Sequence, residues 1–233
     1  MHVICFGDSN TYGYDPRSYL GDRYDPDSRW VDILAQETGW TVDNLGQNGR
    51  EIPTTAPTLP PDTDLLILML GTNDLLQGRS PEEAAAKLEH VLSLVALLPQ
   101  QILLLAPPPM TLGEWVCSSQ LVDHSHTFVL CCQTLAHRLG IPSVNTGDWG
   151  IPLAYDGVHF TQQGHKTFAS KLLEGLHHET KTPLASLPLS ATHRMRRWLH
   201  RERLSADFPR GSKKDDGHPG SHHPGRARTE RVR

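Results

Sequence analysis

The stretches HVICFGDSN (His2–Asn10) and DLLILMLGTND (Asp64–Asp74) are two apolar runs, and in each a glycine and then polar residues follow. Unbroken runs of this length are typical of strands that are buried on both faces of a parallel sheet. In such folds ligands bind beside the carboxyl ends of the strands, at one edge of the sheet. We therefore predict that the two polar clusters lie close together at that edge.

The rest of residues 1–177 continues an alternation of short apolar runs and helical patterns. Ser80 is suited to cap the second helix, and Pro81 suits its first turn. The alternation predicts an α/β fold, a flavodoxin-like three-layer α/β/α domain of about five parallel strands in the order 2-1-3-4-5. The predicted strands are His2–Phe6, Thr41–Leu45, Asp64–Leu70, Gln101–Ala106 and Ser143–Asn145, and the predicted helices are about Arg29–Thr38, Pro81–Leu98, Ser118–Leu139 and Thr161–His177.

Composition fits an ordinary globular protein, with 233 residues, 37% of them hydrophobic and 21% charged. The run Leu65–Leu70 is too short to cross a membrane. The first residues lack the basic start and long apolar stretch of a signal peptide, so we predict a cytoplasmic protein. The cysteines form no C-x-x-C pair and are interpreted as buried or incidental thiols; they are Cys5, Cys117, Cys131 and Cys132.

Charge is divided unevenly along the chain. Residues 1–177 hold 9 basic and 20 acidic residues, a net charge of −11, whereas residues 178–233 hold 13 basic and 6 acidic residues, a net charge of +7. An acidic body argues against a nucleic-acid-binding surface on the domain itself. We predict a folded domain at 1–177 and a basic extension at 178–233 that is largely disordered, because its composition leaves little to bury. The alternative role for the extension is an electrostatic arm for an anionic partner.

Four residues at the predicted edge of the sheet supply the parts of an acyl-transfer site. Ser9 follows the first strand, Asn73 follows the third, and Asp156 and His159 lie in the loop before the last helix. A serine hydroxyl becomes a nucleophile when a base such as imidazole takes its proton. A carboxylate on the other ring nitrogen then fixes the tautomer of that base. The Asn73 amide is suited to donate to a developing oxyanion.

Each cluster alone also has a purely structural interpretation. Gly7-Asp8-Ser9 is also typical of a strand-to-helix turn, Asn73-Asp74 of a cap, and Asp156 with His159 of a turn before a helix or of half a metal site. Their joint occurrence, each where the fold binds ligands, favours catalysis. The sequence has no G-x-S-x-G, H-E-x-x-H or G-x-x-x-x-G-K-[ST] motif, so we predict neither an α/β-hydrolase elbow nor a metal or phosphate site.

These clusters resemble the conserved blocks of the SGNH hydrolase superfamily, the GDSL esterases, over about residues 3–177. The first block has Asn10 where leucine is common. The matching blocks are Gly7-Asp8-Ser9-Asn10, Gly49, Gly71-Thr72-Asn73-Asp74 and Asp156-x-x-His159.

The resemblance implies a role for five residues. Ser9 would be the nucleophile, His159 the general base and Asp156 the residue that orients the base. The oxyanion hole would be formed by the backbone N–H groups of Ser9 and Gly49 and by the side chain of Asn73. No cofactor and no metal ion are implied.

A narrower resemblance comes from CFGDSNTYG at Cys5–Gly13, followed by Arg23-Tyr24 and Arg29-Trp30. This pattern is similar to a branch of arylesterases and acyltransferases whose members are often oligomeric and accept small acyl groups. Tyr12 and Tyr14 occupy positions where some relatives have tryptophan. A ring there would narrow the acyl pocket, and core packing is the alternative. Arg29 and Trp30 are predicted to anchor a loop and the core.

We therefore predict a serine esterase that hydrolyses or transacylates small-acyl carboxylic esters through an acyl-enzyme on Ser9. Its expected partners are a small ester substrate and further copies of itself in a homo-oligomer, with no nucleic acid and no membrane span. One alternative is a thioesterase or lysophospholipase, which would need a long apolar groove. The other is a non-catalytic binding domain, for which a complete Ser-His-Asp set would serve no purpose.

Overall fold

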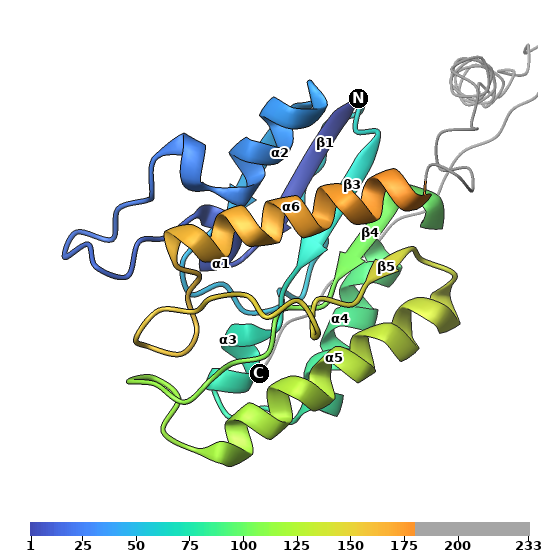
Figure 1. Ribbon diagram of the computed structural model, residues 1–233. Coiled ribbons are helices and arrows are strands. Elements are labelled where there is room, and N and C mark those ends of the chain that lie inside the picture. Colours follow the sequence, from blue (N-terminus) through green and yellow to red (C-terminus); the bar gives the residue numbers. More distant parts are fainter. Residues whose placement is uncertain (180–233) are drawn as a thin grey trace, which may run out of the picture. The chain divides into compact units, whose positions relative to one another are not determined.

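Five parallel strands form one sheet in the predicted order β2-β1-β3-β4-β5 (Figure 1). The computed structural model describes residues 1–179, so nearly all of the predicted extension at 178–233 lies outside the described residues. The strands are β1 (His2–Gly7), β2 (Thr41–Gly46), β3 (Leu65–Met69), β4 (Ile102–Leu105) and β5 (Ser143–Val144).

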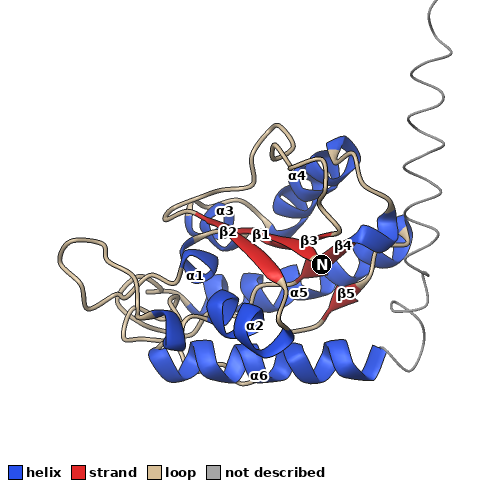
Figure 2. Cartoon of the chain, turned by 90° about the horizontal axis from the view of Figure 1, so that it is seen from above, coloured by secondary structure: helices blue, strands red, loops and turns tan. Residues whose placement is uncertain are grey.

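Helices cover both faces of this sheet and complete the three predicted layers. Figure 2 shows α2 and α6 on one side of the sheet and α4 on the other. None of the helices within residues 1–179 is long and apolar enough to cross a membrane. The helices are α1 (Ser9–Tyr12), α2 (Trp30–Thr38), α3 (Thr72–Leu76), α4 (Pro81–Leu94), α5 (Ser119–Leu139) and α6 (Gln162–Glu179), with 3-10 turns at Pro26–Ser28 and Pro99–Gln101.

Successive side chains of the central strands point to opposite faces of the sheet, as the strand geometry requires. In β1, Val3 and Cys5 pack in the cluster that includes α2 and α6, whereas Ile4 and Phe6 pack in the cluster that includes α4 and α5. All five residues of β3 are buried in the same alternating way. Because both faces of these strands are covered, their sequences are apolar without interruption.

The structure differs from the predicted elements in detail. The helix predicted to end at Leu98 ends at Leu94, since Val95 has an extended backbone (φ −73°, ψ 120°) and is buried in the core. Pro99 in turn keeps Leu98 out of the helical region. The strand β2 is not covered on both faces, since it lies at the edge of the sheet and alternates between exposed and half-buried residues. The short helices α1 and α3 were not predicted, because four or five residues carry no helical periodicity.

Candidate active site

Ser9 lies at the first position of α1, immediately after β1. The Asp8 carboxylate accepts a hydrogen bond from the Asn10 N–H at 2.9 Å and so caps the helix. A side chain at Gly7 would meet the Thr11 hydroxyl at 2.0 Å, so glycine allows α1 to pack closely on the strand that precedes it. This sharp turn directs Ser9 to the carboxyl edge of the sheet.

The three residues predicted as a triad form one hydrogen-bonded chain. The Ser9 Oγ lies 3.0 Å from the His159 Nε2, and the His159 Nδ1 lies 2.7 Å from an Asp156 carboxylate oxygen. All three residues are buried, with exposed fractions of 5% for Ser9, 3% for His159 and 1% for Asp156. Ser9 and His159 are 150 positions apart in the sequence. This is the geometry that an imidazole base requires to take a proton from a hydroxyl.

A tight turn sets Asp156 and His159 side by side. The second carboxylate oxygen of Asp156 accepts hydrogen bonds from the backbone N–H groups of Val158 and His159, both at 2.9 Å. Gly157 has φ +81°, and a side chain there would meet the Thr111 carbonyl at 2.1 Å. Burial raises the pKa of the Asp156 carboxyl, but the hydrogen bonds from His159 and Val158 outweigh burial and hold that pKa below its ordinary value.

The residues predicted to form the oxyanion hole line one pocket together with His159; they are Ser9, Gly49 and Asn73. Asn73 lies in the first turn of α3, and its side-chain amide donates to the Arg50 carbonyl at 3.0 Å, which fixes the orientation of the amide. Gly49 has φ +70° in the loop after β2. The Arg50 guanidinium donates to the Gly7 carbonyl at 3.0 Å and ties this loop to the end of β1. Within residues 1–179, the backbone N–H groups of Ser9 and Gly49 donate to no other group.

Aromatic rings enclose the His159 imidazole on its pocket side. The rings of Tyr14 and Trp115 meet it edge-on, with centroids at 4.7 Å and 4.9 Å. Both line the pocket, which has a volume of about 480 Å³. Tyr12 instead contacts the Arg23 guanidinium at 4.6 Å, so the structure separates the two tyrosines that the sequence left equivalent. Trp115 was missed because it lies in an irregular loop after β4, without any motif.

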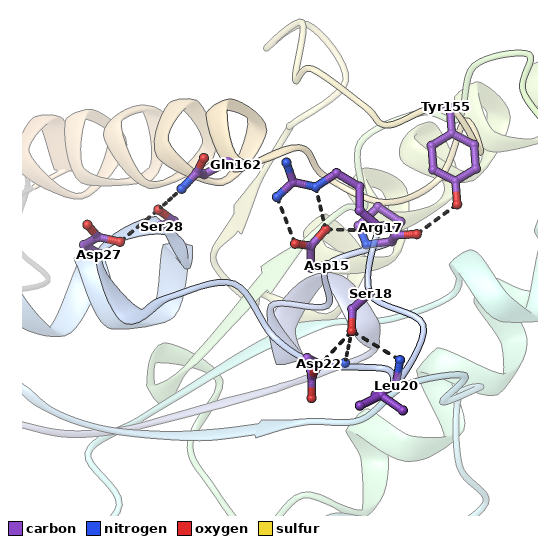
Figure 3. Close-up of polar contacts among 10 residues, drawn as sticks. Asp15, Arg17, Ser18, Leu20, Asp22, Asp27, Ser28, Tyr155 and Gln162 are labelled. Carbon is purple, nitrogen blue, oxygen red and sulfur yellow. Dashed lines mark hydrogen bonds and ion pairs between the residues drawn. The ribbon is translucent and has the colours of Figure 1, made fainter.

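The outer wall of the pocket is the loop at residues 15–22, which holds itself together through polar contacts (Figure 3). The Arg17 guanidinium pairs with Asp15 at 2.9 Å, and the Ser18 hydroxyl donates to Asp22 at 3.1 Å. The Tyr155 hydroxyl donates to the Pro16 carbonyl at 2.8 Å, which ties this loop to the one that carries Asp156. The wall is therefore held by contacts within the chain.

Other titratable groups near the site are perturbed by burial. Burial raises the pKa of Asp8 to about 6, although hydrogen bonds from Asn10 and Thr72 and the charge of His159 oppose the increase. Burial also raises the pKa of the thiols of Cys5 and Cys132, which fits their interpretation as core residues. No three His, Cys, Asp or Glu side chains within residues 1–179 are grouped so that they could hold a metal ion.

Trp30 has the anchoring role in the core that was predicted for the pair Arg29 and Trp30, whereas Arg29 pairs with a residue of α2, the helix that follows it. The Trp30 ring is buried in the core between α2 and α6, and its indole N–H donates to the Asn10 carbonyl at 2.9 Å. Arg29 pairs with Asp32 at 2.9 Å. The hydrogen bonds of the Asn10 side chain, which the sequence did not predict, connect α1 to the loop that carries His159.

Solved structures with the same fold include esterases. The aryl esterase of M. smegmatis is 24% identical with a TM-score of 0.64, over 76% of this chain and 98% of that chain. A putative arylesterase from Agrobacterium tumefaciens has the same identity, TM-score and coverage. A carbohydrate acetylesterase family member from Sinorhizobium meliloti is 21% identical with a TM-score of 0.64, over 76% of this chain and 97% of that chain. Curated protein sequences give no match.

The sequence model of one family agrees with the fold. The GDSL-like Lipase/Acylhydrolase family matches residues 5–167, which include Ser9, Gly49, Asn73, Asp156 and His159. The match covers well over half of the chain and confirms the predicted superfamily. The chain therefore belongs to the GDSL-like lipase/acylhydrolase family and is a carboxylic ester hydrolase.

Proposed function

We propose that the enzyme hydrolyses small-acyl esters through an acyl-enzyme on Ser9. The observation that carries this proposal is the hydrogen-bonded chain from Asp156 through His159 to Ser9, which ends at a pocket lined by Gly49 and Asn73. Acyl transfer requires a nucleophile, a base, an orienting group and oxyanion donors, and this arrangement supplies all four.

In the acylation step the Ser9 Oγ bonds to the ester carbonyl carbon while its proton passes to the His159 Nε2. The tetrahedral oxyanion accepts hydrogen bonds from the Asn73 amide and from the backbone N–H groups of Ser9 and Gly49. The intermediate collapses, the bond to the alcohol oxygen breaks, and that oxygen takes the proton from His159. Asp156 stabilises the imidazolium form throughout.

In the deacylation step water replaces the alcohol. His159 takes a proton from the water as the water oxygen bonds to the acyl carbon. The second tetrahedral intermediate releases the carboxylic acid and returns the proton to the Ser9 Oγ. An alcohol acceptor in place of water would give transacylation, and we keep this as a prediction that is tested by adding an alcohol and measuring the new ester.

The preference for a small acyl group is supported by the walls of the pocket. Tyr14 and Trp115 flank His159, and the pocket volume of about 480 Å³ lies in the usual range for small-molecule sites. The lining mixes polar and aromatic side chains, whereas a thioesterase or lysophospholipase would need a long apolar groove. The structural relatives named as an aryl esterase and a carbohydrate acetylesterase favour the same substrate class.

The mechanism is tested by Ser9→Ala and by acyl chain length. Ser9→Ala should abolish turnover of an aryl acetate and leave the melting temperature close to that of the wild type. An organophosphonate should label Ser9 alone, as mass spectrometry of peptides can show. Ester turnover within tenfold of wild type in the variant would contradict the acyl-enzyme. A series of esters from acetyl to palmitoyl should show kcat/KM falling with length, and a rise would favour the lysophospholipase alternative.

Four further predictions from the sequence stay predictions. They are the cytoplasmic location, the homo-oligomer, the domain boundary near residue 177 and the role of the basic extension.

A further inference from the structure

The Asn10 side chain binds the backbone on both sides of His159. Its Nδ2 donates to the Val158 carbonyl at 3.1 Å, and its Oδ1 accepts from the Phe160 N–H at 2.9 Å. Val158 and Phe160 are the sequence neighbours of His159, so one amide group spans the backbone of the proposed base. This pair of bonds resembles the exchange between opposite residues of two antiparallel strands.

The backbone of Asn10 is fixed as firmly as its side chain. Its N–H donates to the Asp8 carboxylate at 2.9 Å, and its carbonyl accepts from the Trp30 indole at 2.9 Å. Asn10 is 5% exposed and Trp30 is 1% exposed, so water does not compete for these bonds. Asn10 is also bonded covalently to Ser9. It therefore forms a short rigid connection between the nucleophile and the loop that carries His159.

The two bonds to the loop require a primary amide of this length. Asn and Gln carry an N–H donor and an oxygen acceptor on the same planar amide carbon, which lets one side chain bond to a carbonyl and to an N–H that lie side by side. Gln is longer by one methylene group, which this buried position would have to accommodate. Leucine, which is common at this position in the resembling block, offers neither a donor nor an acceptor. Asn10, the residue after the proposed nucleophile, thus fits the carbonyl and the N–H that the loop carrying His159 presents to it.

We propose that Asn10 is a positioning residue that sets the distance between the Ser9 Oγ and the His159 Nε2. It contacts no substrate and acts through His159, so this inference rests on the proposed role of His159 as the base. A displacement of about 1 Å in a catalytic group can cost about 100-fold in rate. Losing both bonds would leave the contact between the Ser9 Oγ and the His159 Nε2 without the support that the Asn10 side chain gives to the loop.

The test measures Asn10→Leu against a control of similar structural cost. Asn10→Leu should lower kcat for an aryl acetate by about 100-fold and change KM by less than threefold, because the base acts in the transition state. The control is Thr146→Val, since this buried hydroxyl donates to the Ala106 carbonyl beyond β4 and does not line the pocket. Thr146→Val should lower the melting temperature and keep kcat.

A second variant covers the case in which Asn10→Leu does not fold. Asn10→Asp is nearly isosteric and keeps the acceptor for Phe160 but loses the donor to Val158, so it should also lower kcat with KM unchanged. A double mutant then separates positioning from general structure. In a His159→Ala background, Asn10→Leu should cause no further loss of the residual activity, because its effect passes through the missing imidazole.

Two results would overturn the inference. One is an Asn10→Leu enzyme with kcat within threefold of wild type, and the other is a loss that adds fully to that of His159→Ala. Failure of the proposed function would look different. In that case the wild type would have no ester turnover, or Ser9→Ala would retain it.

Discussion

The two halves of the proposed active site are built in different ways: the nucleophile half holds Ser9 and Asn73, and the base half holds Asp156 and His159. Ser9 begins the short helix α1 after β1, and Asn73 lies in the short helix α3 after β3. Both strands are inside the sheet, with a neighbour on each side. The positions of Ser9 and Asn73 follow from the backbone hydrogen bonds of the sheet. Asp156 and His159 lie in an irregular loop between β5 and α6, where no sheet bonds fix them. The base half is held by its own turn, by the antiparallel bridge between Leu153 and Phe160, and by contacts from elsewhere in the chain.

The contacts from elsewhere come from three neighbouring segments. The loop after β4 donates to the base loop through backbone N–H groups that include those of Glu114 and Trp115, both at 3.1 Å. The loop at residues 15–22 accepts a hydrogen bond from the Tyr155 hydroxyl at 2.8 Å. Asn10 supplies the contact from α1. The nucleophile half is therefore positioned by the ends of the strands that precede it, whereas the position of the base half depends on tertiary packing. The following experiments test this difference.

Among substitutions that keep the Ser9 hydroxyl, the largest effect is expected in the base half, from Asp156→Asn. The amide keeps the size of the side chain but loses the charge that stabilises the imidazolium, and it can hold His159 in the wrong tautomer. We expect kcat to fall by about 10⁴-fold with little change in fold. Steady-state kinetics and the melting temperature measure the two properties. A loss below tenfold would mean that Asp156 does not orient the base.

A smaller effect is expected in the nucleophile half, from Asn73→Ala. Removing one oxyanion donor should lower kcat by about 10²–10³-fold, which is about 2.7–4 kcal/mol, and leave KM nearly unchanged. Asn145→Ala is the matched control, because Asn145 follows β5 as Asn73 follows β3 but does not line the pocket. An increase in KM alone for Asn73→Ala would instead make Asn73 a residue that binds the ground state.

The stability of the nucleophile half should depend on pH through Asp8. Burial raises its pKa to about 6 from an ordinary value of 3.8, so the native protein holds this proton more tightly than the unfolded chain does. The stabilisation is present at pH 3.8 and below and is lost as the pH rises to about 6, a change of about 3 kcal/mol. The Asp8→Asn side chain does not titrate, so the variant does not lose this stabilisation. Between pH 3.8 and about 6 its free energy of unfolding should therefore rise relative to that of the wild type by about 3 kcal/mol.

Urea unfolding at pH 4 and pH 7 measures this difference for both proteins. Asp156 titrates in wild type and variant alike, so its opposite contribution cancels in the comparison. An equal difference between the two proteins at both pH values would contradict the assignment to Asp8.

The smallest effect is expected at the pocket wall, from Trp115→Leu. In the proposed mechanism His159 delivers a proton to the leaving alcohol, and the Trp115 ring flanks His159 in the pocket, so we expect the alcohol group to contact this ring. Loss of one aromatic contact should cost about 1 kcal/mol, or about fivefold in kcat/KM, for an aryl acetate and less for an alkyl acetate. Trp40→Leu, just before β2 and outside the pocket, should leave the ratio of the two substrates unchanged. If the ratio of kcat/KM for the aryl and alkyl acetates is unchanged in Trp115→Leu, then Trp115 does not contact the alcohol group of the substrate.

The sequence by itself predicted the strand order, the layers and the nucleophile half of the site. This was possible because buried parallel strands need unbroken apolar runs, and the residue after each run must lie at one edge of the sheet. The spacing of Asp156 and His159 also predicted their shared turn, since the three-residue separation is local. Their approach to Ser9 was predicted from the combination of blocks and the resemblance that they carry.

Only the tertiary structure decided how the base half is held and what lines the pocket. Trp115 lies outside every motif, and the block that contains Asn10 does not indicate its contacts, because both roles depend on loops that come together from distant positions. Tyr12 and Tyr14 are chemically alike and two positions apart, and the structure assigns the first to Arg23 and the second to the pocket. Periodicity reports the regular bonds of strands and helices, whereas irregular loops are fixed by individual side-chain contacts that leave no periodic signal.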